Sequence, residues 1–241
     1  MLSTQCVLEK ERGITISPLL YGNVDKTKLR ISPVCHNHLN WVFDLETYGT
    51  DANAIVPEIS AVAFDISTGT PYHEITLHLD IDSQVELGRT VSASTLTFWM
   101  LQHREARMKM LRADPKYCKD MGLPAPLQLG SAMAKLSYEI KTVSELWASE
   151  NPGKSKAPLV WGNGITFDLG KTISLFESAY IPVPWEFWAE RDARTLMDLA
   201  PGIKKAFADD FRGIQHYGLD DCKHEIRYLS ATYVKLMELS N

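Results

Sequence analysis

The amino-acid sequence predicts an α/β fold in which a mixed β-sheet is flanked by α-helices. Apolar segments with strand character come first along the chain, and segments with helical spacing are then interleaved with further strand-like runs. This order of elements indicates a sheet covered by helices. With 241 residues, 45% of them hydrophobic, the chain can bury a full core and suits one α/β domain with modest extensions.

Three strands are predicted near the start of the domain. Residues 39–47, LNWVFDLET, form a short apolar run that ends in carboxylates, and residues 58–67, EISAVAFDIS, form a second run. Residues 75–81, ITLHLDI, alternate so that four apolar side chains, the last of them Ile81, share one face. Three strands in succession predict a meander.

Helices are predicted in the middle of the chain. Ser94 is a candidate N-cap for a helix that leads into the basic segment HREARMKMLR at 103–112. Residues 113–125 contain two prolines and a glycine, so they are expected to form a loop. A longer helix is expected at about 127–149 because a segment rich in Pro, Gly and Lys follows it.

The second half of the chain predicts one more buried strand and three further helices. The strand is PLVWG at 158–162, and PWEFW at 184–188 is a candidate for a last strand. Helices are expected over 167–180 and 191–200. The final helix is the clearest, because its apolar residues repeat at spacings of four and three. These residues are Cys222, Ile226, Leu229, Tyr233 and Leu236.

The first part of the chain lacks a clear pattern. Residues 1–38 show neither sustained helical spacing nor sustained alternation, so we expect an N-terminal extension of unknown role before the domain at 39–241. The motif CHNH at Cys35–His38 offers metal ligands, but they lie too close together for a site without a second cluster. We interpret them as loop residues.

Composition excludes some classes of protein. A formal charge of -5 argues against a protein that coats nucleic acid by charge alone, but not against an enzyme that gathers carboxylates around cations. The four cysteines are scattered and form no C-x-x-C pair, so neither a zinc site nor a disulfide framework is expected. The sequence shows neither an apolar run of about 18 residues nor a signal-peptide pattern, and we therefore expect a cytoplasmic protein without a membrane span.

Carboxylates at separated positions are the candidates for chemistry. Asp44 and Glu46 end the first predicted strand, and alternation puts both on one face. They repel each other there unless a cation lies between them, although a solvated strand end is the ordinary alternative. Asp168 opens a helix after WGNGITF and either caps that helix or contributes to a site. The glycines on either side of Asn163 permit the close approach of a ligand.

The third motif is HYGLDDC, near the start of the final helix. His216 lies five residues before Asp221 and does not share its helical face, so it must reach a site from the preceding loop. That position suits a mobile general base, and a surface histidine is the ordinary alternative.

Taken together and in order, the motifs D-x-E-T, F-D after a Gly-Asn-Gly loop, and H-x-G-x-x-D resemble those of the DEDDh (DnaQ-like) 3′-5′ exonuclease superfamily. The segments TLTFWMLQHREAR, WGNGITFD and FWAERDARTL are similar to a group that includes phage DexA, RNase AS and exonuclease-VIII-like proteins. The resemblance covers roughly Trp41 to Leu239. It implies a ribonuclease-H-like fold and, from the phage members, a phage or prophage origin.

The resemblance also implies a metal-dependent reaction that releases nucleoside 5′-monophosphates from the 3′ end of single-stranded nucleic acid. Two Mg²⁺ or Mn²⁺ ions would be held by Asp44, Glu46, Asp168 and Asp221, with Asp44 between the ions. His216 would take a proton from the attacking water.

A tyrosine competes with this histidine. Tyr217 lies four residues before Asp221, which is the spacing of the tyrosine in the sister DEDDy branch. His216 is favoured because Gly218 and Cys222 supply the small residues of the histidine motif. A neutral imidazole is also a better proton acceptor near pH 7 than a phenol of pKa about 10.

Candidate substrate contacts are less specific. Trp99, with Phe98 beside it, would stack on a terminal base, although an aromatic residue at helical spacing is more often part of a core. Arg191 and Arg194 would meet the phosphate backbone or pair with neighbouring aspartates. The remaining candidates, which adjoin the motifs, are Thr47, Asn163 and Phe167.

Other functions stay open from the sequence. A catalytically inactive nucleic-acid-binding module of the same fold is the alternative from another class, and an exoribonuclease or oligonucleotide phosphodiesterase is the alternative among hydrolases. The resemblance to DexA slightly favours DNA, whereas RNase AS suggests RNA. A homodimer is compatible with the related proteins.

Overall fold

The computed structural model describes residues 34–238, and the rest of the chain lies outside the described part. Most of the predicted extension at 1–38 is therefore not described. Its last residues form a 3₁₀ turn, η2, at Val34–Asn37, and His38 already begins the first strand. The CHNH motif is thus a short turn that leads into the sheet rather than a loop.

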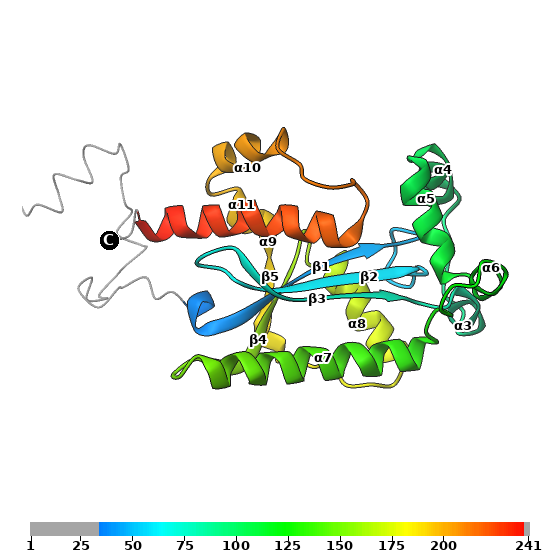
Figure 1. The fold of residues 1–241 in the computed structure, drawn as a ribbon, viewed down its shortest axis with the longest axis horizontal. Coiled ribbons are helices and arrows are strands. Elements are labelled where there is room, and N and C mark those ends of the chain that lie inside the picture. Colours follow the sequence, from blue (N-terminus) through cyan, green and yellow to red (C-terminus); the bar gives the residue numbers. More distant parts are fainter. Residues whose placement is uncertain (1–33, 239–241) are drawn as a thin grey trace, which may run out of the picture. The chain divides into compact units, whose positions relative to one another are not determined.

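Within the described residues the strands form one five-stranded mixed sheet of order β3-β2-β1-β4-β5 (Figure 1). The strands are β1 (His38–Glu46), β2 (Glu58–Asp65), β3 (Thr70–His78), β4 (Ser155–Gly162) and β5 (Glu190–Asp192). The first three strands pair antiparallel, and β4 and β5 run parallel to β1. The predicted meander and the mixed sheet are confirmed.

Helices cover both faces of this sheet, and the faces follow from alternation along β1. Figure 1 shows α7 (Leu129–Glu150) along one face and α11 (Gly218–Glu238) along the other. Trp41 and Phe43 belong to the core on the α7 side, and Val42 belongs to the core on the α11 side. Because side chains alternate along a strand, the acidic residues at positions 44 and 46 share the α11 face with Val42.

Short helices gather where β1 ends (Figure 1). They are α3 (Ile81–Glu86), α4 (Ala93–Leu101), α5 (Arg104–Met110) and α6 (Pro115–Asp120), with a 3₁₀ turn, η3, at Leu111–Ala113. The others are α8 (Asp168–Ser178), η4 (Phe187–Ala189), α9 (Ala193–Met197) and α10 (Pro201–Ala208).

The sequence did not predict two of these helices, α3 and α6, and each begins at an aspartate N-cap. Ile81 was expected in a strand, but Asp80 Oδ1 accepts hydrogen bonds from the N–H groups of Asp82 and Ser83 at 2.8 and 3.1 Å, and α3 begins there. The predicted loop at 113–125 likewise contains α6, which Asp114 caps. A side-chain oxygen that satisfies the first free N–H groups favours even one or two helical turns.

The last strand is displaced from its predicted position. PWEFW at 184–188 is not a strand: its Trp185 packs against Phe43 and Phe176 with ring centroids 5.6 and 5.9 Å apart, and the 3₁₀ turn η4 begins at Phe187. The strand begins two residues later at Glu190, which pairs with Val160 of β4. Of the aromatic side chains of this segment, Trp185 belongs to the core, whereas Phe187 and Trp188 are exposed.

Candidate active site

Three predicted carboxylates meet at the end of β1. Asp44 and Glu46 project from the α11 face of β1, and Asp221 projects from the first turn of α11. One oxygen from each of these residues lies within 4.8 Å of the other two. Oxygens this close can share one divalent cation, for which carboxylates are the preferred hard ligands.

The fourth carboxylate, Asp168, adjoins this group from β4. It opens α8 just beyond the carboxyl end of β4, and β4 is the parallel neighbour of β1. Asp168 is buried, and the backbone N–H of Asn163 donates to its carboxylate. A Cβ on Gly162 would lie 3.0 Å from the Cβ of Asp168. This glycine therefore admits the aspartate, whereas the sequence suggested that it admits a ligand.

Burial and mutual repulsion raise the pKa values of these carboxyl groups. Burial raises the pKa of Asp44 well above its ordinary value, and the charges of Glu46 and Asp168 raise it further. Burial also raises the pKa of Asp168 to about 7 and that of Asp221 to about 6. A cluster of this kind needs a compensating positive charge in order to stay ionised.

The residues fit a divalent cation. Within residues 34–238, the histidine, cysteine and acidic side chains close enough together to hold a metal are Asp44, Glu46 and Asp221. Glu46 Oε1 is buried, and among the described residues it has no hydrogen-bond partner. A buried carboxylate oxygen is stable when a hydrogen bond or a cation satisfies it.

His216 lies beside the cluster in an unusual backbone conformation. Its φ is 62°, in the left-handed region, and the loop before it is held by Asp220, which accepts a hydrogen bond from the N–H of Ile214 at 3.0 Å. Its ring contacts Phe98 and Trp99 edge-on, with centroids 5.4 and 6.1 Å apart. Burial lowers the pKa of His216, and His103 lowers it further, which favours the neutral imidazole at pH 7.

Gly218 brings the start of α11 against β2. A Cβ at this position would lie 2.6 Å from Ser60 Oγ and 3.1 Å from Glu58 Oε1. A larger residue would push α11, and Asp221 with it, away from β1. The glycine of H-x-G-x-x-D is thus a packing requirement.

Tyr217 contacts a lysine of the basic segment at 103–112. Lys109 of α5 places its ammonium 3.3 Å from the centre of the Tyr217 ring. The same ammonium donates to Glu58 Oε1 at 2.6 Å. Glu58 also accepts from Ser60 Oγ at 3.1 Å, and its other oxygen lies 3.3 Å from His78 Nδ1. Lys109 therefore ties α5 to the loop that carries His216.

Replacing Lys109 with Met is expected to destabilise the fold by about 2 kcal/mol, because Glu58 is 2% exposed and would lose its charged donor. Chemical denaturation of the purified protein measures the loss. Lys119→Met, at an exposed position of α6, is the control. In a Glu58→Gln background the same Lys109 substitution should have a smaller effect, and equal losses in both backgrounds would contradict the proposed pairing.

A pocket of about 320 Å³ adjoins Glu46. It is lined by Leu45, Glu46, Thr47, Thr50, Ser94, Thr95, Phe98, Trp99 and Phe167. Three of the predicted substrate residues, Thr47, Trp99 and Phe167, are thus brought together. Trp99 is buried and donates from Nε1 to the Thr47 carbonyl at 2.8 Å, whereas Phe98 is 43% exposed. Phe98 offers the more accessible ring, the reverse of the order expected from the sequence.

Lys171 fixes two walls of this pocket. Its side chain is buried, with the ammonium 3.2 Å from the centre of the Phe167 ring. The ammonium also donates to the Thr50 carbonyl at 3.1 Å. Lys171 therefore holds two parts of the pocket lining in place, the Phe167 ring and the Thr50 backbone.

The other predicted substrate residues lie apart from this pocket. Asn163 lines a separate cleft with Asp44, described below. The Arg194 guanidinium lies over Gly164, 3.4 Å from where a Cβ would be. Arg191 donates to the carbonyls of Trp188 and Glu190.

Asp192 lies between these two arginines in the sequence and was considered as an ion-pair partner for them. In the structure it has a different role. Asp192 accepts hydrogen bonds from the N–H groups of Ile165 and Thr195 at 2.9 and 2.8 Å. It therefore caps α9 and holds the loop that precedes Asp168.

The cleft beside the carboxylates has a volume of about 450 Å³. Its lining comprises Asp44, Asn163, Ala208, Phe211, Gln215, His216, Asp221, His224, Glu225 and Tyr228. Glu225 was not predicted as a site residue from the sequence, although its position four residues after Asp221 places both side chains on one face of a helix.

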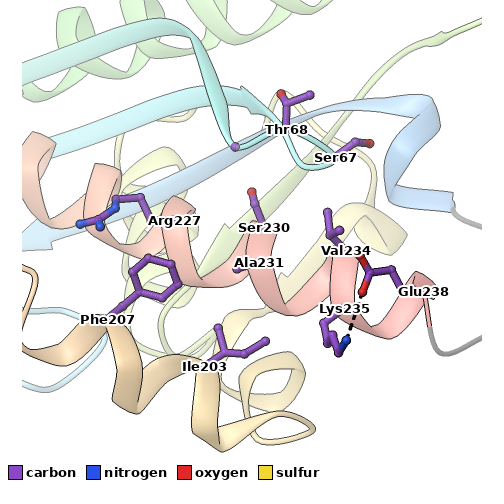
Figure 2. Close-up of a pocket in the computed structure, with 11 residues that line it drawn as sticks. Ser67, Thr68, Ile203, Phe207, Arg227, Ser230, Ala231, Val234, Lys235 and Glu238 are labelled. Atoms are coloured by element: carbon purple, nitrogen blue, oxygen red, sulfur yellow. Dashed lines mark hydrogen bonds and ion pairs between the residues drawn. The ribbon is translucent and has the colours of Figure 1, made fainter.

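A larger cavity of about 480 Å³ lies between α10, α11 and the turn from β2 to β3. Figure 2 shows the side chains around it. Its carboxylate, Glu238, pairs with Lys235 at 3.2 Å. This cavity therefore lacks, among the described residues, the ligands that the cleft beside Asp44 provides.

The mixed sheet, with carboxylates at the neighbouring ends of β1 and β4, defines the class as a ribonuclease-H-like fold with a nuclease-type site. Residues 39–233 match the family model of the 3′-5′ exoribonuclease Rv2179c-like domain, and the chain belongs to that family. The family and the fold together support a nuclease enzyme. The narrower relation to the phage DexA group stays a prediction.

Solved structures share the fold at low sequence identity. Exonuclease I superposes with a TM-score of 0.53 and 13% identity, over 83% of this chain and 43% of that one. E. coli exonuclease I in complex with a dT13 oligonucleotide gives a TM-score of 0.55 and 13% identity, over 84% and 42% of the two chains. The chain thus spans less than half of these proteins.

No curated protein matches the sequence. None of the helices in the described part of the chain is long and apolar enough to cross a membrane.

Proposed function

We propose that this chain removes nucleoside 5′-monophosphates one at a time from the 3′ end of single-stranded RNA, with the help of divalent cations. The observation that carries the proposal is the convergence of Asp44, Glu46 and Asp221 within 4.8 Å, with Asp168 adjoining them. The domain that does this is residues 39–241. The homodimer, the cytoplasmic location and the phage or prophage origin stay predictions.

Each residue of the site has a distinct task in this proposal. Asp44, Glu46, Asp168 and Asp221 hold two Mg²⁺ or Mn²⁺ ions. When bound, the ions lower the pKa of the attacking water and stabilise charge on the leaving 3′ oxygen. His216, with its lowered pKa, accepts the proton of that water.

The pocket beside Glu46 suits the terminal nucleoside. Phe98 and Phe167 provide aromatic surfaces at its wall, and aromatic rings hold unpaired bases without reading their sequence. Arg194, which lies over Gly164 at the loop before Asp168, is placed to meet a phosphate. In this proposal Arg191 and Trp99 support the surrounding backbone.

The family description supports RNA as the substrate, in place of the slight preference for DNA that the sequence suggested. The neighbour that binds dT13 shares only the fold with this chain. Thr50, Ser94 and Thr95 line the pocket with hydroxyl groups, which are able to hydrogen-bond a ribose 2′-hydroxyl.

The test is digestion of matched 5′-labelled RNA and DNA oligonucleotides with Mn²⁺ or Mg²⁺. We expect a ladder of shortened products, with RNA degraded faster than DNA and no products in EDTA. Binding without a ladder would identify an inactive module, and cleavage confined to dinucleotides would identify a phosphodiesterase. Faster digestion of DNA would overturn the choice of RNA.

A further inference from the structure

A fifth carboxylate lies in the cleft beside the metal-type cluster. Glu225 is on α11, one helical turn after Asp221, and is 3% exposed. It lines the same cleft as Asp44 and Asp221. Among residues 34–238 its Oε1 has no hydrogen-bond partner, although it is fully shielded from solvent.

A buried carboxylate oxygen of this kind is unfavourable unless a hydrogen-bond donor or a cation lies against it. A buried acceptor without a partner costs about 1 to 3 kcal/mol, and more when it is charged. Charges of both signs lie around it: the carboxylate of Asp168 raises the pKa of Glu225, and neither Lys204 nor Arg194 singly lowers it as much. Glu225 also adds to the repulsion that Asp44 experiences.

The surroundings indicate a cation rather than a protein donor. Asn163 Oδ1 is a second oxygen in this cleft that is buried and, among the described residues, unpartnered. Asn163 precedes Asp168 by one loop, and Asp168 is also the charged residue that acts most strongly on Glu225. Carboxylate and amide oxygens are hard ligands, which suit Mg²⁺ and Mn²⁺.

We propose that Glu225 is an additional carboxylate ligand of the divalent-cation site, on the side where Asp44 and Asp168 meet. The proposal rests on the cation site of the proposed function and adds to it a ligand that lies outside the three sequence motifs. Asp221 and Glu225, at positions i and i+4 of α11, then contribute two ligands from one helix face.

The test is Mn²⁺ binding to the whole purified chain without nucleic acid, measured by titration calorimetry. Glu225→Gln keeps the size of the side chain and removes its charge. We expect the affinity for at least one Mn²⁺ ion to fall by about 10-fold or more, as is typical when a group that supports a metal is removed. Glu145→Gln, an exposed acid on α7, is the matched control and should bind as the unaltered chain does.

Thermal melting with and without Mn²⁺ gives a second readout. Without metal, Glu225→Gln should melt no lower than the unaltered chain, because the substitution removes a buried charge. Added Mn²⁺ should then raise its melting temperature less. A much lower melting temperature without metal would show that the fold itself satisfies the carboxylate, and this would overturn the proposal.

The outcomes separate the two proposals. Equal Mn²⁺ affinity and stoichiometry in Glu225→Gln and in the unaltered chain would overturn the role of Glu225 and leave the exonuclease proposal standing. Absence of Mn²⁺ binding in the unaltered chain would overturn both.

Discussion

Replacing Asp44 with Asn is expected to reduce the rate of 3′-terminal hydrolysis by about 1000-fold or more, equivalent to about 4 kcal/mol of transition-state stabilisation. Asp44 is the residue on which Glu46, Asp168, Asp221 and Glu225 all act electrostatically. Its removal therefore affects every cation that the cluster holds. Single-turnover digestion of labelled RNA with saturating Mn²⁺ measures the effect.

A melting experiment distinguishes this role from damage to the fold. Without metal, Asp44→Asn should be at least as heat-stable as the unaltered chain, because one of several repelling buried charges is gone. Asp120→Asn, at an exposed position of α6, is the control and should keep its full rate. An Asp44→Asn protein that hydrolyses RNA at the normal rate would exclude this cluster as the active site.

Replacing His216 with Ala is expected to reduce the rate by about 100- to 10,000-fold, the range that general base catalysis contributes. Tyr217→Phe should leave the rate nearly unchanged, because it keeps the ring over which Lys109 lies. Digestion rates of the two variants under the same conditions give the comparison. A large loss in Tyr217→Phe with little loss in His216→Ala would place the enzyme in the tyrosine branch.

The pH profile provides an independent check on His216. A base works when it is deprotonated, so activity rises with pH through the pKa of the histidine. Because burial lowers that pKa from 6.5, this rise should be centred below pH 6.5. His216→Ala should lose this component of kcat/KM.

Parts of the fold that depend on long periodic segments were predictable from the sequence. The alternation in β1 placed Asp44 and Glu46 on one face, and the spacing in α11 identified the final helix. Short elements were not predictable in this way. The helices α3 and α6 depend on aspartate caps, and β5 is a three-residue strand that exists because β4 offers it an edge.

The residues of the candidate site likewise differ in whether the sequence predicted them. The motifs included the acidic residues, which lie at the ends of recognisable strands and helices, and His216, which lies in the loop before α11. The pairing of Lys109 with Glu58 joins residues 51 positions apart, and no local pattern reports it. Glu225 had a usable signal in its spacing from Asp221, but its burial in the cleft follows only from how α11 lies on the sheet.

The small pocket fixed by Lys171 bears on the kind of strand end that the enzyme can accept. Its volume of about 320 Å³ is near the lower limit for small-molecule sites and has room for one nucleoside, not for a base pair. In the proposed reaction a blunt end must therefore open its last pair before cleavage, which costs a few kcal/mol. Preference for an overhang over a paired terminus then arises from geometry, without any residue that senses the complementary strand.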